Sequence, residues 1–193
     1  MKLILASKSG VRKKILEQNS VYCEVVHSNV DEDQAKESLI AAGANPLLIS
    51  KNLAELKSTK VSKNFPGRLV LGADSVISLN DKLVNKPNNR EEAFKILSEL
   101  NDSKHFLISS VCIAKNGSMI WNHSETSELI MKKLSDQNLR SYLEKIETKT
   151  LLAYGVYQVE ANGLDLFKSI KGDMNSIMGL PIKKIKEYLQ LQK

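Results

Sequence analysis

The chain has 193 residues, of which 42% are hydrophobic and 26% are charged. This composition is typical of a globular protein that buries a full hydrophobic core, and we expect one domain spanning residues 1–193. No run of about 18 apolar residues occurs, and the apolar start of the chain is too short for a secretory signal. We therefore expect no membrane association and a cytoplasmic location.

The 28 basic and 22 acidic residues give a formal net charge of +6, and the excess lysines are scattered along the chain. Nucleic-acid-binding surfaces usually cluster arginine with aromatic residues, whereas aromatics make up only 5% of this sequence. We therefore predict no nucleic-acid partner. The charge is equally consistent with a small polyanionic substrate, because a phosphate chain needs only a few converging cations.

The first predicted elements are a buried strand over residues 2–6 and a helix over residues 10–18, joined by a Ser7-Lys8-Ser9-Gly10 turn. Such a turn exposes backbone N–H groups at the positive end of the helix dipole, where an anion binds well. The cations around it are Lys8, Arg12, Lys13 and Lys14. The turn is therefore a candidate phosphate cradle. A capped helix with solvated lysines explains the same residues, and the P-loop pattern is absent.

An acidic loop at residues 31–33 leads into a predicted helix over 35–42. Glu32 in this loop is either a solvated residue at a helix entrance or part of a site. A longer helix is predicted over 46–61. Lys57 lies at the margin of its apolar stripe, so the ammonium either extends to solvent or reaches into a site.

The central strand is predicted over residues 69–79, and its apolar run carries one carboxylate, Asp74. An ionised carboxylate inside a buried strand is costly unless a cation, a metal ion or several donors contact it. Strand alternation places Gly72 on the face of Asp74, where it leaves room beside the carboxylate. Lys86 follows after a short hairpin and loop. A structural carboxylate held by backbone amides is the alternative to a functional Asp74.

The rest of the chain alternates helices with strands. Asn116-Gly117 is a strong hairpin signal that joins two long strands into an antiparallel ribbon, and this ribbon offers a contact for a homodimer. The remaining predicted elements are strands over 21–27, 82–84, 104–115, 118–131, 154–159 and 163–170, and helices over 90–100, over 135–145 and from Pro181 as a first helical residue. Together they predict an α/β fold: a mixed, strongly twisted sheet with flanking helices forms a cleft, and two lobes share one core.

Six ordered segments resemble motifs of the Maf (septum-formation-inhibitor-like) nucleoside triphosphate pyrophosphatases, and the similarity covers essentially the whole chain. The segments, each with its family motif, are 5–13 (LAS-x-S-P-x-R-R), 30–32 (VDE), 53–57 (LA-x-x-K), 72–76 (GAD-T/Q-V), 86–87 (the end of GKP) and 179–181 (GLP). Each motif alone is weak, but six in this order form a specific signal. The resemblance implies the Maf/ITPase-like form of the fold predicted above.

The resemblance also implies hydrolysis of a nucleoside triphosphate between its α and β phosphates. This reaction yields a monophosphate and pyrophosphate and uses a divalent cation, Mg²⁺ or Mn²⁺. Asp74 would be the general base or a metal-bound carboxylate that activates water, and Glu32 would be a further metal ligand. The residues implied to hold the triphosphate and to offset charge on the leaving pyrophosphate are Ser7, Ser9, Arg12, Lys57 and Lys86.

The resemblance implies that three residues border the base, and they are Val11, Ser75 and Glu160. At these positions the dTTP/UTP-hydrolysing branch of the family has Arg, Thr and Gln, so this chain differs from that branch. A carboxylate can accept from the N1–H and the exocyclic amine of guanine, so Glu160 favours a guanine-type substrate. The 7-methyl-GTP branch also has Glu there, but it has Trp at the position of Val11 and Gln at that of Ser75. We predict a guanine-type nucleotide, 7-methyl-GTP included; Glu160 as a plain surface residue is the alternative. This chain also differs from the family motifs at two other positions, where it has Gly10 in place of Pro and Asn85 in place of Gly. Neither difference removes a group that the reaction needs.

Two other functions stay open from the sequence: a non-catalytic nucleotide-binding regulator of cell division, and a pyrophosphatase of dTTP or UTP. A pure binding protein has little need for Asp74 together with an acidic loop and several lysines, so the presence of this charge set favours an enzyme. Substrate preference separates the two enzymatic alternatives.

Overall fold

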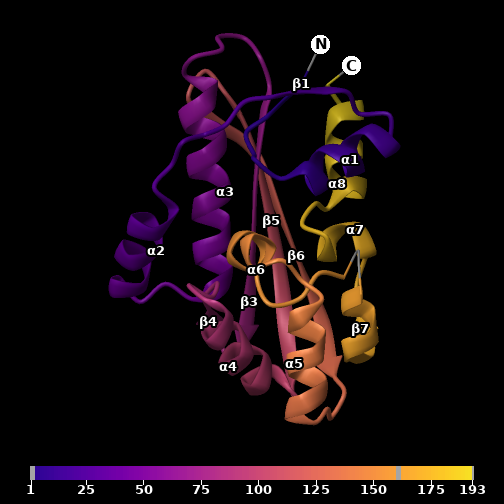
Figure 1. Ribbon diagram of the computed structural model, residues 1–193. Helices are drawn as coiled ribbons and strands as arrows, with labels where there is room; N and C mark the ends of the chain where they lie inside the picture. The colour runs from indigo at the N-terminus through magenta and orange to yellow at the C-terminus, as the bar shows by residue number, and fades with distance from the viewer. Residues whose placement is uncertain (1–2, 160–161, 193) are drawn as a thin grey trace.

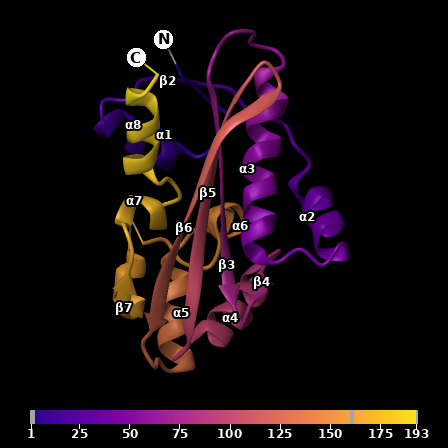
Figure 2. The ribbon, with the colours of Figure 1, turned by 180° about the vertical axis from the view of Figure 1, so that it is seen from behind.

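A seven-stranded mixed sheet organises the computed structural model, which describes residues 3–159 and 162–192 (Figures 1 and 2). The strand order is β2-β1-β3-β5-β6-β7, and β4 also pairs with β3. The strands are β1 Leu3–Leu5, β2 Cys23–Val25, β3 Val70–Leu79, β4 Lys82–Val84, β5 Lys104–Lys115, β6 Ser118–Met131 and β7 Phe167–Lys171. The helices are α1 Gly10–Gln18, α2 Glu32–Ala41, α3 Pro46–Ser62, α4 Arg90–Leu100, α5 Asp136–Glu144, α6 Thr148–Tyr154, α7 Met174–Ile177 and α8 Ile182–Gln190, with a 3-10 turn over Asn162–Leu166.

The predicted α/β class, with a mixed sheet and flanking helices, is confirmed. Within the described ranges, no helix is both long enough and apolar enough to cross a membrane.

The central strand β3 has different partners along its two edges. β5 pairs with it from Val70 to Ser78, so β1 and β4 share the opposite edge. β1 reaches only to Leu71, and β4 begins at Ile77. Between them, in the part of the chain that the structure describes, residues 72–76 have no strand partner on that edge. Such an interruption leaves backbone groups and side chains of the central strand open to a ligand.

Helix α3 packs along one face of β3 and β5, with α2 beside it, as both ribbon views show (Figures 1 and 2). Its close approach depends on Gly72. A Cβ atom at this position would lie 2.2 Å from the Ala54 carbonyl oxygen and 2.8 Å from the Ser58 backbone nitrogen, both on α3. Gly72 is therefore needed for helix packing, beyond the room it was predicted to leave beside Asp74.

The opposite face of the sheet carries a hydrophobic cluster at each end. Side chains of α1 and α8 pack near Leu71 at one end, and those of α4, α5 and α6 pack near Ile77 at the other. Between them lies Ser75, which pairs across the strands with Ser109 of β5, and Ser109 pairs in turn with Glu125 of β6. The two predicted lobes thus share one sheet, and a polar row separates their apolar clusters on this face.

The prediction of a strand over 154–159 is wrong. Helix α6 ends at Tyr154, Gly155 follows with φ of +99°, and the next residues are irregular. Val156 and Tyr157 are residue types typical of strands, but they are buried against the cluster of α4 and α5 and do not pair in the sheet. A buried segment that does not pair in a sheet has the same apolar sequence pattern as a buried strand, so the pattern alone does not distinguish them.

Several predicted boundaries also shift, and three of them have a local cause or consequence. The helix predicted over 35–42 begins at Glu32, because the Asp31 side chain caps the backbone there. The strand predicted from residue 163 begins only after a 3-10 turn. Pro181 is the N-cap of α8 and lies just outside the helix.

One buried histidine makes the fold sensitive to acid. His105 of β5 is fully buried, and its Nε2 lies 3.0 Å from Tyr157 Oη. Burial lowers the pKa of His105 from 6.5 to about 4. Between these values the unfolded chain binds a proton and the folded chain does not. This contribution to stability is therefore complete above pH 6.5 and falls as the pH drops toward 4.

We expect the free energy of unfolding in urea to fall by about 2 kcal/mol between about pH 7.5 and about pH 5 on account of His105. His105→Gln removes the titrating group, so this part of the pH dependence should disappear even though the variant is less stable at both pH values. An unchanged pH dependence in His105→Gln would contradict the assignment.

Candidate active site

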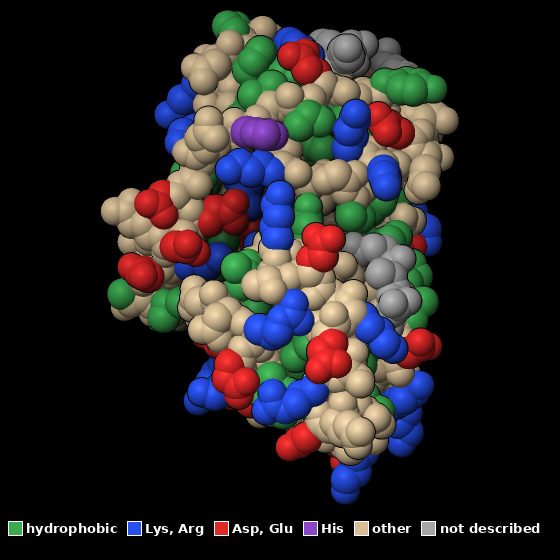
Figure 3. Space-filling model, viewed as in Figure 1, with side chains coloured by type: hydrophobic (Ala, Val, Ile, Leu, Met, Phe, Trp, Pro, Cys, Tyr) green, Lys and Arg blue, Asp and Glu red, His purple; other side chains and the backbone are tan. Residues whose placement is uncertain are grey.

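A cavity of about 430 Å³ opens at the interrupted edge of β3. It is lined by the turn between β1 and α1, by α3 and β3, by the loop before α4 and by residues from α6 to the loop after α7. In the space-filling view, basic side chains (blue) and acidic side chains (red) lie close together in the hollow beside α2 (Figure 3). The volume is that of a small-molecule pocket.

The turn between β1 and α1 forms one wall of the cavity. Ser9 Oγ caps α1 by accepting from the Arg12 backbone nitrogen at 3.3 Å. Ser7 Oγ accepts from the Ser9 nitrogen at 3.1 Å and from Arg12 Nη1 at 3.4 Å. Both hydroxyl groups serve as acceptors within the protein and keep their own protons to donate to an anion. The positive end of α1 favours the same ligand.

Part of the predicted ring of cations around this turn faces the cavity. Lys8 and Arg12 line it, whereas Lys13 and Lys14 are exposed outside it, and Lys13 pairs with Glu17 at 3.5 Å. The two sequence interpretations are therefore compatible. The helix is capped and some of its lysines are solvated, yet two cations remain at the cavity wall.

Arg12 ties three segments together at the cavity. Its Nε donates to the Gly179 carbonyl at 3.0 Å, and its Nη1 donates to the Ala73 carbonyl on the open edge of β3 at 3.0 Å. Its Nη2 donates to Ser75 Oγ at 3.2 Å. A guanidinium has five N–H groups. After these bonds and the one to Ser7, a single N–H is left for a substrate oxygen.

The surroundings of Arg12 hold it in this position. Gly179 has φ of +99°, and a Cβ atom there would lie 3.2 Å from both Arg12 Nε and Ser75 Oγ, so a larger residue would crowd the guanidinium. Burial lowers the pKa of Arg12, and the charges of Asp74 and Glu32 act in the opposite direction. Arginine stays charged under these conditions because its ordinary pKa is so high.

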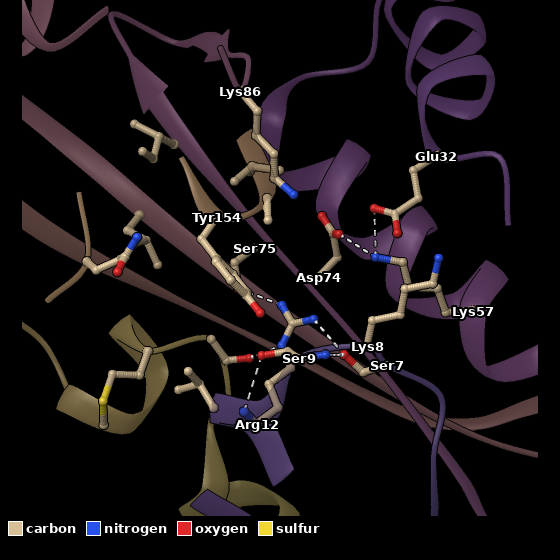
Figure 4. A pocket seen from close by; sticks show the side chains of 18 of the residues that line it. Ser7, Lys8, Ser9, Arg12, Glu32, Lys57, Asp74, Ser75, Lys86 and Tyr154 are labelled. Atoms are coloured by element: carbon tan, nitrogen blue, oxygen red, sulfur yellow. Dashed lines mark hydrogen bonds and ion pairs between the residues drawn. The ribbon is translucent and has the colours of Figure 1, made fainter. Parts of the chain in front are cut away.

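Another wall of the cavity holds a buried ion-pair centre. Lys57 Nζ of α3 lies 2.8 Å from Asp74 Oδ1 and 3.0 Å from Glu32 Oε2 (Figure 4). Lys57 is only 5% exposed, and Asp74 is 6% exposed. The alternative of a lysine that extends to solvent is therefore wrong. The cation that the sequence requires beside Asp74 is Lys57.

One oxygen of this centre has no partner. Asp74 Oδ2 is buried and makes no hydrogen bond within the described residues. A buried carboxylate oxygen in this state is costly, so it marks a point where a cation or a donor binds favourably. Burial alone would raise the pKa of Glu32, but the charges of Lys57, Lys86 and Lys36 outweigh burial and lower it. Glu32 is therefore ionised, as a cation ligand must be.

Lys86 reaches the cavity from a third side, on the loop between β4 and α4 (Figure 4). Burial lowers the pKa of Lys86, and the nearby carboxylates of Glu32 and Asp74 partly offset this. Among the described residues it forms no ion pair. Its charge is therefore available to an anion, in contrast to that of Lys57, which contacts two carboxylates.

The remaining part of the cavity contains the positions expected beside a base. Val11 and Ser75 line it, and Glu160 lies outside the described residues. Several further lining residues were not expected from the sequence, among them Tyr154 and Gln158. No motif marks these two residues, and both fall where a strand was wrongly predicted.

Comparison with known proteins assigns this arrangement to a family. A family model described as Maf-like protein matches residues 2–192. The chain belongs to the Maf family. A "Nucleoside triphosphate pyrophosphatase" of Pelagibacter ubique is 56% identical over 99% of this chain and 98% of its own length. A "7-methyl-GTP pyrophosphatase" of Rhizobium etli is 34% identical over 94% of this chain and 91% of its own. Among solved structures, a Mycobacterium abscessus nucleoside-triphosphatase / dITP/XTP pyrophosphatase is 12% identical over 98% of this chain and 94% of its own, with a TM-score of 0.46.

The predicted resemblance to Maf proteins is thus confirmed, and the structure brings the Maf motifs together. All predicted site residues that the structure describes line the cavity, and they are Ser7, Ser9, Val11, Arg12, Glu32, Lys57, Asp74, Ser75 and Lys86. Gly179 of the last motif lines it as well. Segments far apart in the sequence therefore meet at one place, the interrupted edge of β3.

Gly72→Ala tests whether the close packing of α3 on β3 builds this site. The added Cβ would overlap backbone atoms of α3, so we expect a loss of about 1–3 kcal/mol in the free energy of unfolding. Gly10→Ala is the matched control, because a Cβ there meets nothing within 4 Å and the residue is helical. This control should gain about 0.4–1 kcal/mol. Equal changes for the two variants in urea unfolding would show that Gly72 has no special packing role.

Proposed function

We propose that the chain hydrolyses a nucleoside triphosphate between its α and β phosphates, releasing the monophosphate and pyrophosphate, in the cytoplasm. The observation that carries the proposal is the buried centre of Asp74, Lys57 and Glu32 beside a turn suited to an anion. Membership of the Maf family supports it, and so does the name of the 56% identical Pelagibacter ubique relative.

The triphosphate would be held from several sides of the cavity. Ser7 and Ser9 offer hydroxyl protons, and Lys86 offers an ammonium that forms no ion pair within the described chain. Arg12 offers one N–H, so its larger part in the proposal is to keep Ser75 and the turn in place. Bonds from charged donors to phosphate are about twice as strong as neutral ones. They also offset the charge that develops on the leaving pyrophosphate.

Mg²⁺ or Mn²⁺ fits the donor set of the cavity. No group of three or more His, Cys, Asp and Glu residues gathers in the described ranges, so a site made by the protein alone is absent there. Mg²⁺ is usually held by one or two carboxylates together with substrate phosphates. Asp74, with its unpartnered Oδ2, and Glu32 would supply those carboxylates. When bound, the ion would neutralise phosphate charge and make a water molecule easier to deprotonate.

Asp74 is the group on which turnover would depend. Its Oδ1 is fixed by Lys57, which orients the carboxylate and leaves Oδ2 to act as the base or as the cation ligand. In the reaction, the water oxygen bonds to the α phosphorus and the bond to the bridging oxygen breaks. The electron pair leaves with pyrophosphate, and a carboxylate within hydrogen-bond reach takes up the proton of the water.

Asp74→Asn keeps the volume of the side chain and removes its charge and its basicity. We expect pyrophosphate release in Mg²⁺ to fall by roughly 100-fold or more, while nucleotide binding measured by calorimetry is largely retained. Asp81→Asn, at an exposed aspartate of the turn between β3 and β4 and away from the cavity, is the matched control and should behave as the wild type. Wild-type turnover by Asp74→Asn would overturn the assignment.

We further propose a guanine-type base, with 7-methyl-GTP among the substrates. The residue type of Glu160 supports this, because a carboxylate can accept two hydrogen bonds from the edge of guanine. Uracil and thymine present one N–H between two carbonyl groups, which suits a carboxylate poorly. The Rhizobium etli relative is named for 7-methyl-GTP, which is consistent with this choice.

A panel of GTP, 7-methyl-GTP, dTTP and UTP tests the base. We expect kcat/KM for at least one guanine nucleotide to exceed that for UTP by roughly tenfold or more. Glu160→Gln should reduce this ratio, because an amide also donates to carbonyl groups. A clear preference for UTP or dTTP over both guanine nucleotides would refute the role of Glu160.

A further inference from the structure

Tyr154 is a large aromatic side chain left open at the cavity. It is the last residue of α6, lines the cavity and is 52% exposed. In the close-up its ring points toward Ser75 and Arg12 and away from Glu32 (Figure 4). No hydrogen bond of the described residues includes its hydroxyl group. The ring therefore has a free face in the cavity.

The support under this ring is firmly held. Leu151 of α6 is fully buried in the cluster formed with α4 and α5. Arg90 at the start of α4 donates to the Leu143 carbonyl at 2.6 Å and the Ile146 carbonyl at 2.8 Å, and to Thr148 Oγ1 at 2.8 Å. These bonds hold the segment between α5 and α6 in place against α4. Because the backbone beneath Tyr154 is held in this way, only the rotation of its side chain is lost when a ligand covers the ring.

The cavity is divided by chemistry in the same way as a nucleotide. Lys57, Asp74 and Glu32 lie together in the close-up, away from the ring of Tyr154 (Figure 4). The lining also includes apolar side chains, among them Ile177, which belongs to the same hydrophobic cluster as Leu151 of α6. A nucleoside triphosphate likewise joins a highly charged chain to a flat base. The charged part of the cavity suits the phosphates, so the flat part of the ligand would reach the part with Tyr154.

We propose that the ring of Tyr154 stacks on the base of the bound nucleotide; the inference rests on the proposed function. Val11, the other residue expected beside the base in this part of the cavity, has no ring to stack, whereas Tyr154 at the end of α6 has one. Every base has a π-face, so this contact strengthens binding without selecting among bases. Selection is left to groups that meet the edge of the base.

Tyr154→Leu keeps an apolar side chain and removes the ring. Stacking on an aromatic residue contributes about 1–3 kcal/mol per base. We therefore expect KM for GTP and for UTP to rise by roughly 5- to 150-fold with little change in kcat. For ribose 5-triphosphate, which has no base, kcat/KM should stay within about twofold. Tyr154→Phe, which keeps the ring, should lose far less than Tyr154→Leu.

Tyr22→Leu is the matched control, because Tyr22 is an exposed tyrosine outside the cavity and should not affect any of these substrates. Equal losses for GTP and ribose 5-triphosphate in Tyr154→Leu would overturn the stacking role, and so would an unchanged KM for GTP. Calorimetric binding of an α,β-methylene GTP analogue tests the same contact without turnover. Weaker binding by Tyr154→Leu would support stacking even if the wild type released no pyrophosphate, a result that would refute only the proposed function.

Discussion

The contact between Lys57 and Asp74 is the interaction on which the rest of the site depends. It joins the longest helix to the central strand, and the helix lies close enough only because Gly72 has no side chain. An intact buried ion pair adds little to stability, whereas removal of one partner costs roughly 3–5 kcal/mol because the other charge stays buried. The pair therefore matters mainly because it positions the carboxylate of Asp74. It fixes a carboxylate in the cavity with one oxygen unused.

The cavity itself follows from the interruption on the edge of β3. β1 stops before Asp74 and β4 starts after it, so the central strand exposes an edge in the middle of the sheet. Arg12 closes part of that edge by binding the Ala73 carbonyl, and it connects the edge to the loop at Gly179. On the other lobe, Arg90 fastens the entry to α6. The two sides of the cavity are thus held by arginine bonds to backbone carbonyls, and the ammonium of Lys86 and the hydroxyl protons of Ser7 and Ser9 are left for the ligand.

The long elements and the charged site residues could be predicted from the sequence for physical reasons. The helices over 10–18 and 46–61 and the ribbon around Asn116-Gly117 carry clear periodicity or turn chemistry, and the structure has them within a residue or two. Asp74 stands out because a carboxylate in an apolar strand needs a partner. The family motifs then indicated which lysines and serines surround it, although the roles of these residues stay predictions.

Other parts could not be predicted from one sequence. Helix α6 has seven residues, too few for a reliable periodic pattern, and the buried residues after it resemble a strand. Helix α6 lies at the cavity because of packing between elements that are distant in the sequence. The residues around Tyr154 in the sequence therefore do not indicate that it lines the cavity. The sequence likewise does not show that Arg12 connects separate segments, because its hydrogen bonds to Ala73, Ser75 and Gly179 depend on the fold. Glu160 lies outside the described residues, and its contact with the base stays a prediction.

The central claim is that a substrate's phosphate chain and a divalent cation meet at Asp74. The most direct measurement is a crystal structure with Mn²⁺ and an α,β-methylene nucleoside triphosphate, in which anomalous scattering locates the ion. We expect the Mn²⁺ peak beside Asp74 Oδ2, with phosphate oxygens of the analogue on the same ion and Lys86 on the phosphate chain. An ion and a phosphate chain bound away from Asp74 would contradict the claim.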